Sequence, residues 1–369
     1  MTSLSDVSVP SRVAGNDEGV GLDELALATR NHGMPLELMR HDLTPLGAHY
    51  LLTHFDIPYV DPRTFRLELG GAVDHPVSLT LDELRSRPTV TVPVTLECAG
   101  NGRARLHPRP VSQPWLHEAV GTMAWTGTPL GPLLREAGVA PDGIDVVFTG
   151  ADHGIERGEE QDYARSLPLP MALGGDVLLA WAGNGADLPP QHGAPLRLVV
   201  PGWYGMASVK WLRRIEVVRT TFDGYQMRAY RLRQSPEEAG EALTRIAPRA
   251  LIAPPGFPDF MSRTRVLRIG PHELEGRAWS GHGPVTAVDV TVDGGATWAP
   301  ARLHPPVGPW AWRRWTLPWD VREPGRYVVS ARAEDATGRA QPHQLTEAPW
   351  NRGGFANGAL HRLDVVVPG

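Results

Sequence analysis

The stretch "TVPVTLECAGNGRARLHPRP", residues 91–110, holds Cys98, the only cysteine of the chain. Apolar and polar residues alternate from Val90 to Val94, which predicts a half-buried β-strand with Cys98 at its carboxyl end. Glycine and asparagine at positions 100–102 then favour a turn with positive φ that lets the backbone approach a ligand closely. The stretch therefore places a thiol at the rim of a sheet.

Three interpretations of this thiol are open from the residues alone. In the first interpretation, Cys98 is a small buried hydrophobic residue at the end of a strand. The other two interpretations need the thiolate, which attacks electrophiles or binds metals. Positive charge lowers the pKa of a nearby thiol and so favours the thiolate. Such charge follows Cys98 on four residues: Arg103, Arg105, His107 and Arg109. A nucleophile needs a histidine and an orienting asparagine or aspartate nearby in space. A metal ligand needs a cofactor to supply the other ligands, because the chain has neither CxxC nor HExxH.

Composition bounds the possible functions. The 369 residues suggest two domains, and 41% hydrophobic with 21% charged residues is ordinary for a chain with a sizeable core. A net charge of -5 argues against a nucleic-acid partner. No apolar run approaches the ~18 residues of a membrane span, which argues against a membrane partner. The N-terminus shows no secretory signal, so we expect a cytoplasmic location, or a periplasmic one if the chain is already processed.

Three parts follow one another along the chain. Residues 1–45 form an N-terminal arm, of which residues 1–20 lack periodicity and are expected to be mobile, and residues 22–32 are expected to form a short helix that ends at Gly33. Residues 46–245 mix short strands and short helices without regular βαβ alternation, which predicts an α+β fold. Within them, Thr80 and Glu83 have the spacing of a capping box, and Asn184–Gly185 predicts a hairpin.

Residues 246–369 show a different pattern, with strand-like segments separated by turns and almost no helix. Val288, Val290 and Val292 share one face of such a segment, and the polar residues between them occupy the other. This pattern predicts an immunoglobulin-like β-sandwich that lacks the paired cysteines of antibody domains.

The stretch "QHGAPLRLVVPGWYGMASVKWL", residues 191–212, is suited to an anionic ligand. It places four polar side chains among glycines: His192, Arg197, Ser208 and Lys210. Phosphate sites use such donors together with backbone N–H groups, and Lys210 is the only lysine among 36 basic residues. The alternative is a strand pair with solvated charges. Tyr163 lies in a polar stretch that reads as a loop, where it serves packing or catalysis.

Six segments occur in one order along the chain: "TLECAGNGR", "YARSLPLPMAL", "DVLLAWAGNGADLPPQHGAPLRLVVPGWYGMASVKWL", "AWSGHGPVTAVDVTVDGGATW", "WAWRRW" and "APWNRGG". From about Asp61 to the C-terminus, the chain resembles the sulfite oxidase family of mononuclear molybdenum enzymes. The resemblance implies a molybdopterin-binding catalytic domain over residues 46–245. It also implies an immunoglobulin-like dimerisation domain over residues 246–369, and hence a homodimer.

The resemblance implies that Cys98 is the protein thiolate on molybdenum, because the pterin supplies the other sulfurs and one soft protein ligand suffices. Asn101 of the same turn is then counted as cofactor-binding. Arg103 matches a family arginine that binds the substrate oxyanion. Trp115 matches an aromatic residue that forms one wall of the substrate pocket. Tyr163 matches a tyrosine near the metal's equatorial oxo group. The resemblance also implies that four polar residues of the stretch 191–212 bind the pterin and its phosphate: His192, Arg197, Ser208 and Lys210.

Two departures from the family pattern concern the substrate pocket. "THFDIP" offers His54 where animal and plant members carry an arginine, and a histidine there would titrate near neutral pH. "WNRGG" offers Arg352, whereas an ungapped match puts Gly353 at the family's arginine position. His54 and Arg352 are therefore candidate pocket residues; Arg352 serves from one position away, or the pocket has one arginine fewer. The departures bear on the substrate more than on the cofactor.

The resemblance implies oxidation of sulfite to sulfate. No cytochrome b5-like segment and no CxxCH motif occurs, so we expect no haem and a separate electron acceptor such as a cytochrome. A second hypothesis keeps the cofactor and changes the substrate to another S-oxide, N-oxide or organosulfur compound. A third is a non-catalytic dimeric scaffold whose tryptophan-rich sandwich binds a partner protein.

Overall fold

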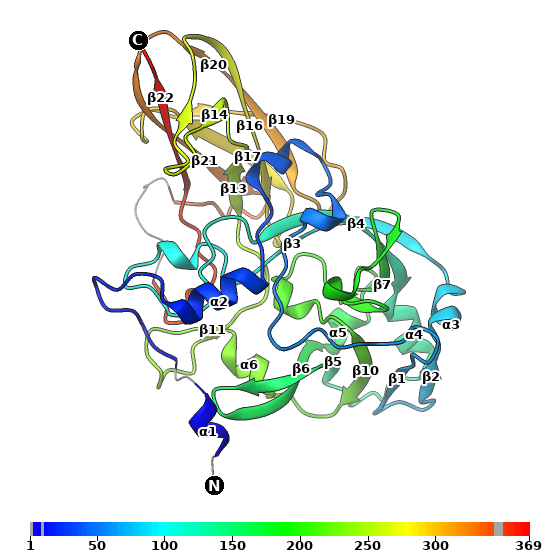
Figure 1. The fold of residues 1–369 in the computed structure, drawn as a ribbon. Helices are drawn as coiled ribbons and strands as arrows, with labels where there is room; N and C mark the ends of the chain where they lie inside the picture. The colour runs from blue at the N-terminus through cyan, green and yellow to red at the C-terminus, as the bar shows by residue number, and fades with distance from the viewer. Residues whose placement is uncertain (1–2, 9–10, 343–349) are drawn as a thin grey trace.

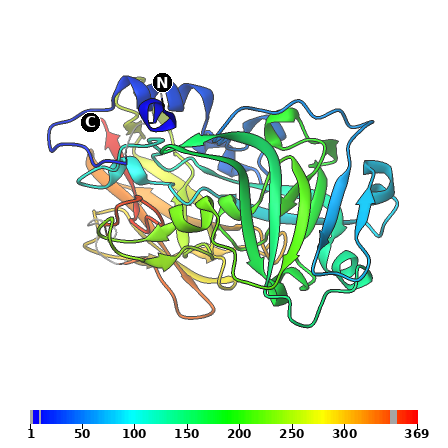
Figure 2. The same cartoon turned by 90° about the horizontal axis from the view of Figure 1, so that it is seen from below.

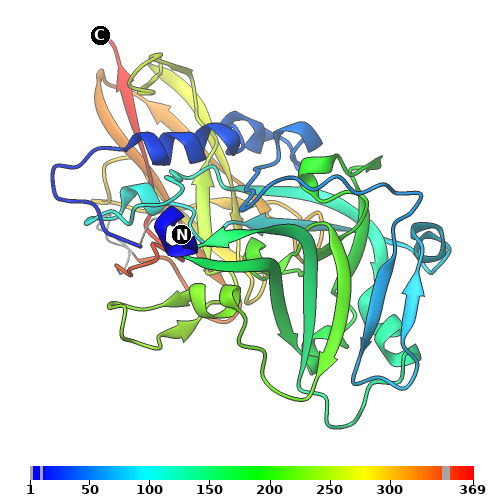
Figure 3. The same cartoon turned by 60° about the horizontal axis from the view of Figure 1, so that its bottom comes forward.

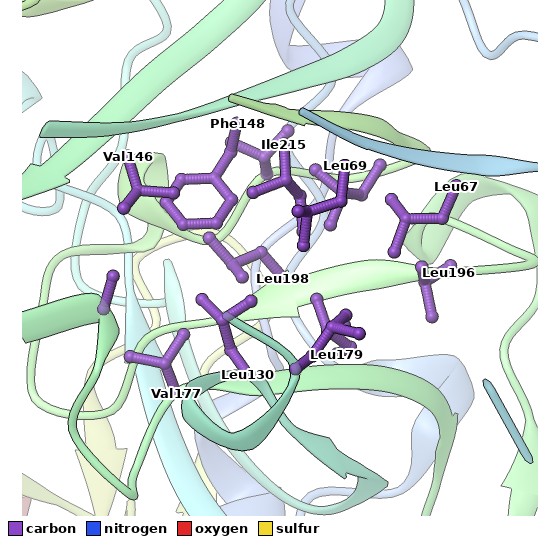
Figure 4. Packing of buried hydrophobic residues seen from close by; sticks show 14 of the residues in the cluster. Leu67, Leu69, Leu130, Val146, Phe148, Val177, Leu179, Leu196, Leu198 and Ile215 are labelled. Carbon is purple, nitrogen blue, oxygen red and sulfur yellow. The ribbon is translucent and has the colours of Figure 1, made fainter. Parts of the chain in front are cut away.

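Two sheets facing one core build the central region, residues 46–245. The computed structural model describes residues 3–8, 11–342 and 350–369. One sheet has the order β2-β1-β10-β5-β6, with bounds Val77–Leu79, Leu67–Gly71, Leu212–Val218, Asp145–Glu156 and Glu159–Pro168. The other runs β3-β4-β7-β8 with β9 also on β7, with bounds Val90–Glu97, Val120–Pro129, Leu178–Gly183, Ala186–Asp187 and Arg197–Val199. Leu69, Phe148 and Ile215 of the first sheet lie across from Leu179 and Leu198 of the second (Figure 4).

Two further sheets make up the C-terminal region, residues 246–369, at the top of Figure 1. The four-stranded sheet β13-β16-β20-β19 has bounds Arg249–Ile252, Gly270–Trp279, Arg313–Val321 and Arg302–Leu303. The six-stranded sheet β14-β15-β22-β21-β17-β18 has bounds Phe257–Pro258, Arg265–Val266, His361–Val367, Gly325–Asp335, Val285–Thr291 and Ala299–Pro300. Apolar residues of both sheets form one buried cluster. The region is thus mostly strand, and the immunoglobulin-like label and the boundary at residue 246 stay predictions.

The helices of the described chain are short. In the central region they are α3 (Leu81–Arg85), α4 (Leu130–Glu136), α5 (Leu169–Ala172) and α6 (Tyr225–Ala229). The predicted capping box begins α3: the Glu83 N–H donates to Thr80 Oγ1 at 3.0 Å and the Thr80 N–H donates to Glu83 Oε2 at 2.7 Å. No helix in the described ranges is long and apolar enough to cross a membrane.

The local turn and alternation signals hold with two adjustments. Asn184 and Gly185 have φ of 51° and 79°, as a tight hairpin requires. The returning strand of this hairpin is the short β8, and β9 pairs with β7 separately. Thr291, which we expected on the polar face of β17, is buried. Its hydroxyl donates to Asp293 Oδ1 and accepts from the Gly295 N–H, so its polar group is paired inside the protein.

The N-terminal arm is packed against the body instead of free. It contains α1 (Leu4–Val7), α2 (Leu22–Arg30) and the 3-10 turn η1 (Leu36–Arg40), and the 3-10 turn η2 (Leu46–Ala48) follows it. Buried Glu24 of α2 forms an ion pair with Arg109, and the Ala14 N–H donates to the Arg109 carbonyl at 2.8 Å. Figures 2 and 3 show the blue arm running along one side of the molecule, past the loop that follows β3.

Candidate functional site

Cys98 lies one residue beyond β3, as the alternation predicted, and it is buried and unpaired. Its N–H donates to the Ala119 carbonyl at 2.9 Å, and its carbonyl accepts from the Asn101 N–H at 3.0 Å. Of the three turn residues, only Gly102 has positive φ, at 92°. The turn is therefore tight, but the expectation of positive φ at Gly100 and Asn101 is wrong.

Cys98 separates two cavities. An inner cavity of about 70 Å³ and an outer cavity of about 480 Å³ share four lining residues: Leu52, His54, Cys98 and Tyr230. A ligand that filled the inner cavity would therefore meet a molecule in the outer one at the thiol. Four of the cofactor candidates and Tyr163 line only the inner cavity, whereas Arg103 and Arg352 line only the outer one.

The inner cavity is lined by the four polar residues predicted to hold the cofactor: His192, Arg197, Ser208 and Lys210. Arg197 donates to the carbonyls of His192 at 3.0 Å and Ser208 at 3.2 Å. Lys210 Nζ donates to the carbonyls of Leu52 and Gln191, both at 3.0 Å. Neither cation forms an ion pair with a carboxylate of the described residues, so their charge is available to an anion.

The pKa values of three side chains that line the inner cavity show that burial disfavours positive charge in it. Burial lowers the pKa of Arg197 to about 10. Burial, reinforced by Arg197, lowers the pKa of Lys210 to about 7. Burial and the neighbouring His49 lower the pKa of His192 to about 2. An anion in the cavity would reverse the shifts of the two cations by favouring their charged forms.

Four titratable residues of the inner cavity were not predicted from the sequence: His49, Tyr50, Asp152 and Tyr230. His49 Nε2 and Asp152 Oδ1 are buried without a hydrogen-bond partner in the described chain. Burial raises the pKa of Asp152 to about 6 and lowers that of His49 to about 4. A histidine-, proline- and aromatic-rich stretch without periodicity over residues 34–62 was the one signal for His49.

Arg103, predicted to bind the substrate oxyanion, lines the outer cavity. Its Nε donates to the Gly353 carbonyl at 2.9 Å and its Nη1 to Ser112 Oγ at 3.0 Å, and it forms no ion pair with a described carboxylate. Arg352 also lines the outer cavity, with Nη2 donating to the Ser11 carbonyl at 3.1 Å. Gly353, at the ungapped position, thus orients Arg103 through its carbonyl.

His54 and Tyr163 meet beside the thiol. Their ring centroids are 5.1 Å apart; His54 Nε2 bonds Tyr230 Oη at 2.9 Å, and Tyr163 Oη donates to the Met206 carbonyl at 2.9 Å. Tyr163 lies in strand β6 and not in a loop, which corrects the interpretation from its polar neighbours. Burial lowers the pKa of His54 from its ordinary value.

The charge around Cys98 acts differently from the sequence expectation. Burial raises the pKa of the thiol, and this effect outweighs the opposing influence of Arg103. Arg105 is exposed, and Arg109 is paired with Glu24. In the structure the thiol is therefore favoured over the thiolate, and a metal would have to displace its proton.

Two predicted site residues line neither cavity. Trp115 packs with Cys98 in one buried cluster. The Asn101 amide donates to Glu97 Oε1 at 3.0 Å, and its oxygen accepts from the Ala119 N–H at 3.2 Å. The structure places both behind the Cys98 turn, where they support it.

Four arginines of the outer cavity come from segments that sequence reasoning did not connect: Arg12, Arg157, Arg231 and Arg233. With Arg103 and Arg352 they make six arginines, against one carboxylate, Glu156, among the described lining residues. Such an excess on a chain of net charge -5 favours an anionic ligand.

Two family models match the chain. Residues 54–226 match the oxidoreductase molybdopterin binding domain, and residues 250–367 match the Mo-co oxidoreductase dimerisation domain. The sulfane dehydrogenase SoxCD from Paracoccus pantotrophus has a similar solved structure, with a TM-score of 0.77, 26% identity, and coverage of 97% of this chain and 93% of that chain.

Curated relatives include two enzyme types. Sulfite oxidase from Gallus gallus is 34% identical over 361 residues, which is 89% of this chain and 74% of that protein. Nitrate reductase [NADH] 1 from Oryza sativa subsp. japonica is 31% identical over 360 residues, 89% of this chain but 39% of the relative. The chain thus spans about two fifths of that nitrate reductase.

Proposed function

Because the chain belongs to the sulfite oxidase family of molybdopterin oxidoreductases, we propose that it oxidises sulfite to sulfate and passes the electrons to a separate acceptor such as a cytochrome. Family membership makes it an oxidoreductase and excludes the non-catalytic scaffold. The observation that carries the proposal is the position of Cys98, the sole thiol, between a cavity of unpaired cations and an arginine-lined cavity.

The donor chemistry of the residues around the inner cavity fits a molybdenum–pterin cofactor with a phosphate, although the cavity volume of about 70 Å³ is smaller than the whole cofactor would fill. The chain offers one thiol, two buried cations without a described carboxylate partner, and an unpartnered His49 Nε2. We propose that Cys98 ligates molybdenum and that four residues hold the pterin and phosphate: His192, Arg197, Ser208 and Lys210. When bound, this cofactor supplies oxo transfer and accepts two electrons.

The outer residues would bind and orient the substrate. Arg103 and Arg352 offer guanidinium donors to the sulfite oxygens, in a buried setting where charge-assisted hydrogen bonds are strong. Sulfite oxidation takes up one water oxygen and releases two protons and two electrons. With Tyr163 and Tyr230, His54 can orient the water beside Cys98, and the burial that lowers the pKa of its imidazole makes it a weak acceptor for the released protons.

The deciding experiment measures molybdenum per chain by mass spectrometry in wild type and Cys98→Ser, together with reduction of ferricyanide by sulfite. We expect about one molybdenum per wild-type chain, as one thiol ligand implies, and loss of metal and activity in the variant. A wild-type chain without molybdenum, made in cells that synthesise the cofactor, would contradict the proposal.

Replacing Arg103 tests the substrate side. Loss of a charge-assisted hydrogen bond in Arg103→Ala should raise the KM for sulfite about 10- to 100-fold, and added salt should raise the wild-type KM. Arg105→Ala is the matched control, since that arginine is exposed and lines neither cavity. Equal KM values in the two variants would remove Arg103 from the substrate site.

The size of the outer cavity favours a second candidate substrate. A volume of about 480 Å³ falls in the range of drug-sized ligand pockets, and sulfite needs far less. A larger anionic S-oxide, N-oxide or organosulfur compound would fill it and reach the outer arginines. Molybdenum without sulfite activity, combined with turnover of S-oxides by a reduced dye, would favour this candidate.

Two further expectations are proposals of the same kind. We propose that the acceptor lies outside the chain, which would carry no haem, and that the protein is cytoplasmic. The visible spectrum of the purified protein and cell fractionation test them.

A further inference from the structure

We propose that the C-terminal region positions the Cys98 turn within its own chain, so that Arg249 and Trp279 are positioning residues for the metal ligand. The inference rests on the proposed function only where it takes Cys98 as that ligand. The matched domain is described by its role in dimerisation. The contacts below lie inside one chain and need no second copy.

The first contact is a buried carboxylate directly before the thiol. Glu97 Oε1 accepts from Arg249 Nη1 at 2.7 Å and from Asn101 Nδ2 at 3.0 Å, and Glu97 Oε2 accepts from Trp279 Nε1 at 2.8 Å. Arg249 on β13 and Trp279 on β16 are cross-strand partners. Glu97, Arg249 and Trp279 are 2%, 4% and 2% exposed.

A second set of contacts comes from residues 353–357, near the C-terminus. The Ala356 N–H donates to the Ala99 carbonyl at 2.9 Å, and Asn357 Nδ2 donates to the Gly102 carbonyl at 2.7 Å. Residue 353 supplies the carbonyl that accepts from Arg103 Nε. The turn from Ala99 to Arg103 is therefore held at its beginning, middle and end by the C-terminal region.

These contacts define one geometry for the thiol. A buried carboxylate with three donors cannot move without leaving charges unpaired in a dry interior, which is strongly unfavourable. Because Glu97 precedes Cys98 and Asn101 follows it, the ion pair with Arg249 fixes the backbone on both sides of the ligand. A shift of the C-terminal region would displace the thiol relative to both cavities.

The test uses the single thiol as its own reporter. In protein prepared without the metal, the rate of Cys98 alkylation reports how often the turn opens, because no other cysteine reacts. Trp279→Phe removes the indole donor to Glu97 together with part of the buried ring volume. Trp312→Phe is the matched control: Trp312 is also buried, its ring centroid is 6.5 Å from that of Trp279, and its Nε1 donates at 2.8 Å to the Asp42 carbonyl, away from the turn.

We expect Trp279→Phe to be alkylated about tenfold faster than wild type, the factor that corresponds to losing about 1.4 kcal/mol of hydrogen bonding to a charged acceptor. The Mo(V) electron paramagnetic resonance signal of the loaded variant should also shift, and Trp312→Phe should match wild type in both measurements. Equal alkylation rates in the two variants would overturn the proposal. Absence of molybdenum from wild type would instead overturn the proposed function, since alkylation needs no metal.

Discussion

Lys210 shows at the scale of one residue how burial prepares the inner cavity. Its Nζ rests on two backbone carbonyls, and no carboxylate of the described chain forms an ion pair with it. Burial and Arg197 lower its pKa from 10.5 to about 7. The charged form of Lys210 therefore lowers the stability of the folded protein, and an anion bound in the cavity would offset this effect.

Because Lys210 is the only lysine, selective ¹³C-lysine labelling should give one ε-carbon resonance, and in cofactor-free protein it should titrate near pH 7. Between about pH 7 and 10.5 the unfolded chain binds the extra proton, so the free energy of unfolding should rise with pH across this window. Lys210→Met should lack that lysine-dependent rise. A resonance that titrates only near 10.5 would contradict the burial argument.

At the scale of an element, helix α2 and the segments next to it in the N-terminal arm contribute to the wall of the outer cavity. The arm brings Ser11, Arg12, Leu27 and Asn31 to its lining. The buried Glu24–Arg109 ion pair holds the helix, and Arg109 also donates to the Gly19 carbonyl at 2.8 Å. The N-terminal arm therefore forms part of the wall of the outer cavity, although most side chains of α2 are exposed to solvent.

Glu24→Gln should loosen this wall, because it leaves the Arg109 charge poorly compensated. We expect amide hydrogen exchange over residues 22–30 to accelerate at least about tenfold while the sheets keep their protection. Asp23→Asn, on the exposed face of the same helix, is the control. Unchanged exchange in Glu24→Gln would show that other contacts hold the arm.

At the scale of the whole molecule, the dimerisation domain match supports a homodimer. Three exposed apolar side chains gather in the β14–β15 hairpin of this region: Phe257, Phe260 and Met261. Phe260 and Met261 are 82% and 84% exposed in one chain. Apolar surface of this kind usually marks an interface.

Sedimentation should therefore give a mass of twice 40.2 kDa, and the double substitution Phe260→Ser with Met261→Ser should shift the equilibrium toward the monomer. Leu22→Ser changes an equally exposed leucine on the arm and should leave the mass unchanged. A dimer that survives the double substitution would place the interface elsewhere in the C-terminal region.

The sequence by itself determined the features that depend on neighbouring residues. The alternation before Cys98, the Thr80–Glu83 capping box and the Asn184–Gly185 turn are set by side-chain direction and local backbone preference, and the structure confirms them. The family also follows from the sequence, because its segments occur in order along the chain.

Only the tertiary structure decided which residues meet and how charged they are. His49, Asp152 and the outer arginines are far from Cys98 in sequence, and the folding of the sheets and the arm brings them to the same cavities. Burial raises the pKa of Cys98 although Arg103 opposes it, and burial lowers the pKa of His54 in the same direction as the nearby cations Lys210 and Arg103. Burial depends on every element packed around a group, so no local pattern can encode it.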